Sequence, residues 1–205
     1  SVPIQQIDAG EGGRQIVVKA VEAILVQLAG NLADFVQAHV KSQYFNPHGA
    51  VNRLAEEVAG FHLPGDALGR RLGAVLEAVA ERAGWGASLP EGRAQGIACS
   101  NDGGTVAAEV AEISLDPDTG RIQVHRVVAA VDPGRVINPD GAKAQIEGSI
   151  VMGTSAALLE EITVKDGRVQ EGNFDRYPLL RMAEAPEVGT ILLEAPDGKP
   201  RGLGE

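Results

Sequence analysis

The chain has 205 residues, a formal net charge of −10 and an apolar fraction of 44%. A chain of this length can bury a core of its own without disulfides or a structural metal. Its 28 acidic residues against 18 basic ones disfavour nucleic-acid binding, because most of the surface would repel a polyanion. Cys99 is the only cysteine and is expected to be a free structural thiol, and the four histidines are too scattered for a usual zinc motif. We therefore expect no metal bound by side chains of this chain.

The first segment, residues 1–65, is expected to be helical and of uncertain origin. Apolar residues recur at helical spacing over residues 14–41, which predicts one long helix or two shorter ones broken near Gly30. No window reaches the ~18 uncharged apolar residues of a membrane span. The chain opens with Ser1 and stops at Glu205, and both ends look like cuts in a longer protein.

A second helix is predicted over residues 66–83, which begin the second segment, residues 66–205. Leu72, Val75 and Val79 fall on one face of this helix, and Gly84 is expected to end it. Trp85 follows directly and is expected to anchor the packing of this region.

From residue 95 the pattern changes from helix to strand. Alternating apolar residues predict strands, and Asp, Gly and Pro predict the turns between them. The expected strands are 96–100, 105–115, 121–131, 161–164, 169–174 and 190–194. An Asp166-Gly167 turn should pair two of them as a hairpin. Helices in the first half, and antiparallel hairpins around a helix in the second, predict an α+β fold of antiparallel or mixed hairpins packed with helices.

The predicted helix over residues 138–160, capped by Asn138, is rich in small residues. Each glycine in a helix costs about 1 kcal/mol relative to alanine, so something is expected to approach this backbone closely. Packing against a neighbouring element is the favoured explanation, and a bound cofactor is the other. Gln145 favours the cofactor slightly, because an amide in an apolar, glycine-flanked helix needs hydrogen-bond partners.

Few other residues suggest chemistry from the sequence alone. Glu205 follows Gly202-Leu203-Gly204 and could act as a general base if desolvation raised its pKa, although a solvated chain end is the simpler interpretation. Asp132 is expected to cap its own turn. His125 is expected at the surface and Tyr177 as an anchor in the core.

Several phrases of the second half occur together, in the same order, in one known family. They include residues 110–116, residues 119–134, Gln145-Ile146-Glu147-Gly148-Ser149 and the closing Gly202-Leu203-Gly204-Glu205. Together they resemble the molybdenum-cofactor-binding large subunit of the xanthine dehydrogenase and aldehyde oxidase family. Residues 173–182 and 183–188 are most similar to its isoquinoline 1-oxidoreductase β-subunit group, which includes cytochrome-linked aldehyde dehydrogenases.

The resemblance implies a fold like that of molybdopterin-binding domains and assigns site residues. Glu205 corresponds to the family's catalytic glutamate, which acts as a base. Gln145 corresponds to the glutamine that hydrogen-bonds the pterin, and the small residues after it, Gly148 among them, permit that approach. Gly204 belongs to the same cofactor-binding set. The implied activity is oxidation of aldehydes or hydroxylation of N-heterocycles, with water as the oxygen source.

The resemblance also implies partners. These are the remainder of the large subunit, an iron–sulfur small subunit or a cytochrome, a small-molecule substrate and, in a homo-oligomer, further copies of the chain. Related enzymes occur in the cytoplasm and at the periplasmic side of the membrane. We expect this chain alone to be inactive and to bind little cofactor. The alternatives are a non-catalytic binding or assembly module and, more weakly, an acid–base enzyme that uses Glu205 with Glu160 or Glu161.

Overall fold

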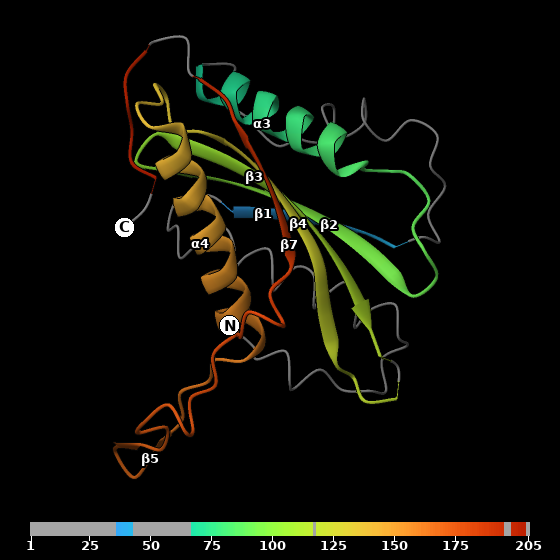
Figure 1. Cartoon of the computed structure of the whole chain (residues 1–205), viewed down its shortest axis with the longest axis vertical. Helices are drawn as coiled ribbons and strands as arrows, with labels where there is room; N and C mark the ends of the chain where they lie inside the picture. The colour runs from blue at the N-terminus through green and yellow to red at the C-terminus, as the bar shows by residue number, and fades with distance from the viewer. Residues whose placement is uncertain (1–35, 43–66, 117, 195–197, 204–205) are drawn as a thin grey trace.

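A five-stranded mixed sheet organises the computed structural model, which describes residues 36–42, 67–116, 118–194 and 198–203 (Figure 1). The strand order is β1-β2-β3-β4-β7, and all neighbours are antiparallel except β4 and β7, which are parallel. The strands are β1 (Val36–Ser42), β2 (Arg93–Asp102), β3 (Thr105–Leu115), β4 (Ile122–Asp132) and β7 (Glu187–Leu192). Helix α3 (Ala67–Ala83) covers one face, and α4 (Pro139–Leu158) covers part of the other.

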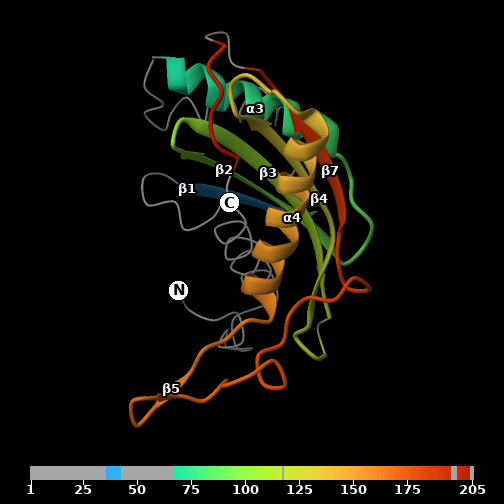
Figure 2. The same cartoon turned by 60° about the vertical axis from the view of Figure 1, so that its left-hand side comes forward.

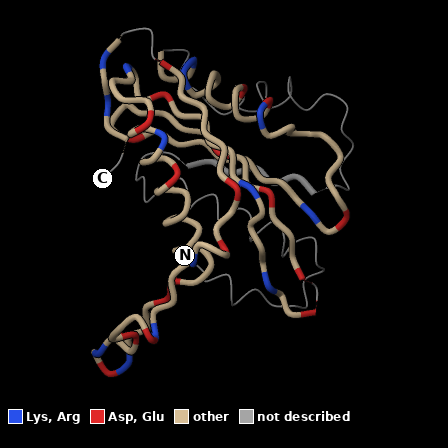
Figure 3. The backbone as a smooth tube through the Cα atoms, viewed as in Figure 1, with Lys and Arg blue, Asp and Glu red and all other residues tan. Residues whose placement is uncertain are grey.

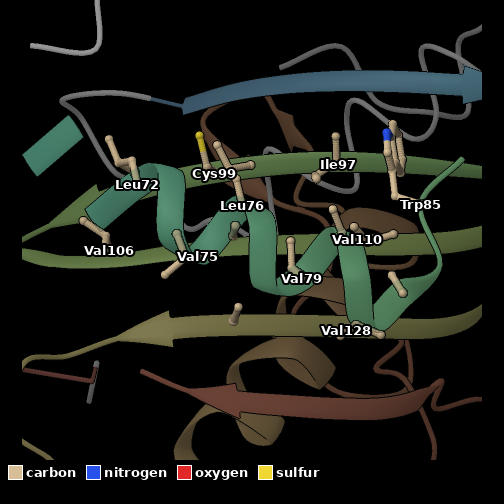
Figure 4. Close-up of a cluster of buried hydrophobic side chains, with 14 residues drawn as sticks. Leu72, Val75, Leu76, Val79, Trp85, Ile97, Cys99, Val106, Val110 and Val128 are labelled. Atoms are coloured by element: carbon tan, nitrogen blue, oxygen red, sulfur yellow. The ribbon is translucent and has the colours of Figure 1, made fainter. Parts of the chain in front are cut away.

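Helix α3 packs across β2, β3 and β4 through the apolar face that its spacing predicts (Figure 4). Gly84 ends the helix in the left-handed region, at φ 67°, where glycine is the favoured residue. Trp85 is buried in the same cluster, and the Gln95 amide donates to the Ala83 carbonyl oxygen over 3.2 Å. The predictions for this helix and for Trp85 are therefore confirmed.

Helix α4 connects two parallel strands, β4 and β7, as a crossover. Asn138 caps it, because its side-chain oxygen accepts from the Gly141 amide over 3.1 Å. Ile146 and Ile150 are buried against the sheet among alanine and valine side chains of β2, β3 and β4. One face of α4 is thus fixed on the sheet.

The α+β prediction, with antiparallel and mixed pairing, is confirmed. The helix expected to continue to residue 41 is wrong at its end, because residues 36–42 form β1 and pair along β2. Val36, Ala38 and Val40 also alternate with polar residues, and pairing with an edge strand selects that period of two. β1 thus joins a sheet built by the second segment, while the boundary near residue 65 stays a prediction.

The predicted Asp-Gly hairpin forms, but only as β5 (Val164–Lys165) and β6 (Arg168–Val169). Asp166 and Gly167 both have positive φ, as a two-residue hairpin turn requires. Tyr177 is not the expected core anchor, because it lies on this projecting part of the chain and its hydroxyl donates to Glu160.

Among the described residues, no helix is long and apolar enough to cross a membrane.

The sheet face under α4 buries a carboxyl group, that of Glu109. This side chain is 8% exposed, and among the described residues its Oε2 has no hydrogen-bond partner. Ala98 and Ala129 lie directly opposite it on the neighbouring strands, so its immediate cross-strand neighbours are apolar. Burial raises the pKa of Glu109 to about 7.

Glu109 should make stability depend on pH. Between about pH 4.5 and 7 the folded state keeps a proton that the unfolded state has lost, so the free energy of unfolding should fall by roughly 3 kcal/mol as pH rises through this range. Glu109→Gln should remove this fall and unfold at higher urea concentration than the wild type at pH 8. Glu77→Gln, at an exposed site on α3, is the control. If the free energy of unfolding changed with pH equally in the wild type and in Glu109→Gln, burial of the Glu109 carboxylate would carry no cost and the prediction would be wrong.

Candidate functional site

The end of the described chain, residues 198–203, lies against the turn that links β4 to α4 (Figure 1). The Arg201 amide donates to the Pro133 carbonyl oxygen over 2.8 Å, and the Arg135 amide donates to the Lys199 carbonyl oxygen over 3.1 Å. The terminal segment is therefore held by its backbone.

Two glycines make this close approach possible. At Gly134, with φ 74°, a Cβ atom would lie 1.8 Å from the Lys199 carbonyl oxygen, so no other residue fits without moving the backbone. At Gly104, with φ 87°, a Cβ atom would meet the Arg201 side chain at 3.0 Å. Thr105 next to it donates from its hydroxyl to the Gly202 carbonyl oxygen over 2.5 Å.

A buried ion pair holds these two turns together. Arg71 of α3 donates from Nε to Asp132 Oδ2 over 2.6 Å and from Nη1 to the Gly104 carbonyl oxygen over 2.6 Å. The other Asp132 carboxylate oxygen accepts from the Gly134 amide over 2.8 Å, which confirms that Asp132 caps its own turn. Arg71 was not predicted as a site residue. We call Arg71, Gly104, Asp132 and Gly134 the clasp.

Beyond the clasp, the chain reaches α4. Leu203 packs against the buried cluster that contains Ile146 and Ile150 of that helix. The described end of the chain lies beside α4 in both views (Figures 1 and 2). Gly204 and Glu205 lie outside the described residues, so their assigned roles stay predictions.

Gln145 and Gly148 lie one turn apart on the outward side of α4, where positions three residues apart share a face. Both are exposed, and in the described part of the chain the Gln145 amide makes no hydrogen bond. A Cβ atom at Gly148 would have nothing within 4 Å. The close packing favoured from the sequence is therefore not found at Gly148. An unpaired amide beside an open backbone fits a bound group that needs hydrogen bonds.

The other candidates have plainer explanations. Cys99 is buried, and burial raises the pKa of its thiol to about 11, so it stays an unreactive structural thiol. His125 is half-buried, with Nε2 2.7 Å from the Ser114 hydroxyl oxygen. Glu160 accepts from the Tyr177 hydroxyl over 2.6 Å, at the opposite end of α4 from the clasp. No three His, Cys, Asp or Glu side chains of the described residues gather to hold a metal.

Comparison with known proteins identifies the relatives of this chain. The family model of the molybdopterin cofactor-binding domain matches residues 15–186, more than half of the chain. The chain is 34% identical over 196 residues to the isoquinoline 1-oxidoreductase β subunit of Brevundimonas diminuta, covering 94% of this chain. It is 36% identical over 140 residues, 66% of its length, to the membrane-bound pyrroloquinoline-quinone aldehyde dehydrogenase of Gluconacetobacter polyoxogenes.

The matches cover only a part of these relatives. This chain spans 24% of the isoquinoline oxidoreductase subunit and 18% of the aldehyde dehydrogenase. Among solved structures, the reconstituted CO dehydrogenase of Oligotropha carboxidovorans matches with a TM-score of 0.45 and 25% identity, over 49% of this chain and 13% of that one.

The clasp should contribute measurably to stability. Arg71→Met leaves the Asp132 carboxylate buried without its ion-pair partner, which should lower the free energy of unfolding by about 3 kcal/mol in urea titrations. The exposed pair between Arg121 and Glu184, 3.8 Å apart, offers the control. Arg121→Gln should change the same quantity by less than about 1 kcal/mol. If both variants lowered the free energy of unfolding by a similar small amount, the clasp would not contribute to stability as predicted.

Proposed function

Because the chain belongs to the molybdopterin cofactor-binding domain family of xanthine dehydrogenase and aldehyde oxidase large subunits, we propose that it forms part of the cofactor site of a molybdenum hydroxylase. The observation that carries this proposal is the unpaired Gln145 amide beside the open backbone of Gly148 on α4. Both residues lie on the helix against which the terminal segment packs through Leu203. Gln145 and Gly148, which the sequence motifs assign to the cofactor, and the terminal segment thus lie on the same side of the sheet, at α4.

Each proposed site residue has a separate role. Gln145 holds the pterin through its amide, which can both donate and accept. Gly148 leaves the helix backbone accessible, and Gly204 does the same in the terminal segment. Glu205 acts as the general base of the reaction. When bound, the molybdenum cofactor supplies the redox chemistry, and the protein groups orient it and control access.

The proposed substrates are aldehydes or N-heterocycles, with water supplying the oxygen. The relatives' names support both classes, since one is an isoquinoline oxidoreductase and another an aldehyde dehydrogenase. The remaining partners are the rest of a large subunit and an iron–sulfur small subunit or a cytochrome. Because the chain spans about a quarter of the length of the isoquinoline 1-oxidoreductase β subunit, we propose that it is inactive when isolated.

Glu205→Gln tests the catalytic role. In the complete enzyme that contains this sequence, the substitution keeps the size of the side chain but removes its basicity. The turnover number should fall by about 10²- to 10⁴-fold with molybdenum content unchanged. The measurement is steady-state oxidation of an aldehyde and of an N-heterocycle. Undiminished turnover would exclude Glu205 as the base and favour a non-catalytic assembly role for this chain.

Gln145→Ala tests the binding role in the same enzyme. Loss of a hydrogen bond worth about 1 kcal/mol should weaken cofactor retention roughly fivefold. The readout is molybdenum and pterin content per polypeptide after extended dialysis. Gln123→Ala, at an exposed glutamine on β4, is the matched control and should retain the wild-type content. Equal retention by the two variants would exclude a pterin contact at Gln145.

A further inference from the structure

A projecting arm, residues 160–184, carries most of the uncovered apolar surface of the described chain. It extends away from the sheet and contains β5 and β6 (Figures 1 and 2). All large apolar side chains that are exposed within the described residues fall between positions 137 and 182. They are Ile137, Met152, Ile162, Val164, Val169, Phe174, Leu179 and Met182. Six of these eight belong to the arm.

The arm keeps its shape through polar contacts and leaves its apolar side chains outside. Glu171 accepts from both the amide and the hydroxyl of Thr163, over 2.7 and 2.6 Å. Tyr177 donates to Glu160 across its base. Phe174 and Met182 are 75% and 96% exposed. Residues 161–170 are all exposed, polar and apolar alike, so the arm does not bury its own apolar side chains.

The arm also has little that could stabilise it alone. β5 and β6 pair with two residues each, and an isolated two-stranded hairpin is marginally stable in water. The Leu180 amide donates to the buried Ser155 hydroxyl oxygen over 3.0 Å, and this hydrogen bond attaches the returning segment of the arm's backbone to α4. A base fixed on α4 and exposed apolar side chains are typical of a segment that docks on another polypeptide.

Two hollows continue this apolar surface. One, of about 290 Å³, lies within the arm and is lined by Ile162, Phe174 and Tyr177 among others. The other, of about 670 Å³, lies at the base of the arm, where Leu158 and Leu180 face the β3–β4 hairpin. Side chains of a docked polypeptide can enter both.

The charges of the arm favour a protein partner. Lys165 and Arg168 lie beside Asp166 at the tip, and positive and negative side chains alternate along the arm (Figure 3). A surface of mixed sign has no net attraction for nucleic acid or for an anionic lipid surface, whereas a polypeptide can match charges of both signs.

We propose that the arm is a docking element for the part of the molybdenum hydroxylase large subunit that lies outside this chain, an inference that rests on the proposed function. The isoquinoline 1-oxidoreductase β subunit is about four times as long as the stretch that this chain matches, so most of such a subunit is available to cover the arm. The apolar side chains of the arm become buried in that contact, and the outward face of α4 next to it becomes one wall of the cofactor site.

Hydrogen exchange tests the docking directly. The exchange rates of the arm amides are compared in the isolated chain and in the large subunit purified from the source organism. The comparison is the same whether that large subunit consists of one polypeptide or of two. Exchange over residues 160–184 should slow at least tenfold in the large subunit. Equal exchange in both would overturn the proposal. Burial of the arm in a dimer of the isolated chain, or on anionic phospholipid vesicles, would also overturn it.

A pair of substitutions separates docking from folding. Phe174→Ser combined with Met182→Ser should leave the melting temperature of the isolated chain unchanged, because both side chains are exposed. The same pair should reduce the yield of assembled large subunit at least tenfold. Glu77→Ser with Glu81→Ser, exposed on α3, is the control and should assemble normally. Normal assembly by the arm variant would contradict the proposal.

Molybdenum analysis of the same preparations distinguishes this proposal from the proposed function. An arm that is protected in a subunit without molybdenum would support docking and contradict the cofactor role. An arm that exchanges freely in a subunit with stoichiometric molybdenum would do the opposite.

Discussion

The buried ion pair between Arg71 and Asp132 connects parts of the chain that are otherwise separate. Arg71 belongs to the helix on one face of the sheet, and Asp132 ends the strand that leads to the helix on the other face. The pair also fixes the two turns against which the terminal segment lies. Two buried charges are favourable only when their geometry and their hydrogen bonds are good, and both conditions hold here. The terminal segment therefore lies against turns whose position depends on a contact between distant parts of the chain.

The two helices differ in how much of their surface the described chain covers. Helix α3 buries a regular apolar stripe and forms a core with apolar side chains of β2, β3 and β4. Helix α4 buries isoleucines on one side and shows the opposite side, with Gln145 and Gly148, to the outside. An exposed amide on an uncovered helix face is free to exchange its water for a ligand or another polypeptide. Both faces of the sheet therefore carry a buried core, and the proposed site residues Gln145 and Gly148 lie on the outward side of α4.

Much of this architecture could be predicted from local patterns. The apolar spacing of α3, the Asp116 turn and the Asn138 cap depend on residues a few positions apart, and each of them forms as predicted. The strand at residues 36–42 could not be found in this way, because its pairing with β2 overrides a helical spacing. Arg71 was missed for the same reason, since 61 residues separate it from Asp132 in the chain. Gln145 was predicted as a site residue through family motifs, and this role stays a prediction, while the packing around it could be described only from the fold.

The central claim is that the outward face of α4 binds the pterin of a molybdenum cofactor within a larger subunit. An experimental structure of the complete large subunit, at a resolution that shows side chains, tests it most directly. The account predicts the Gln145 amide at about 3 Å from a pterin nitrogen or oxygen, with the terminal segment alongside. A structure in which this face of α4 is packed against protein, with the cofactor bound elsewhere, would contradict it.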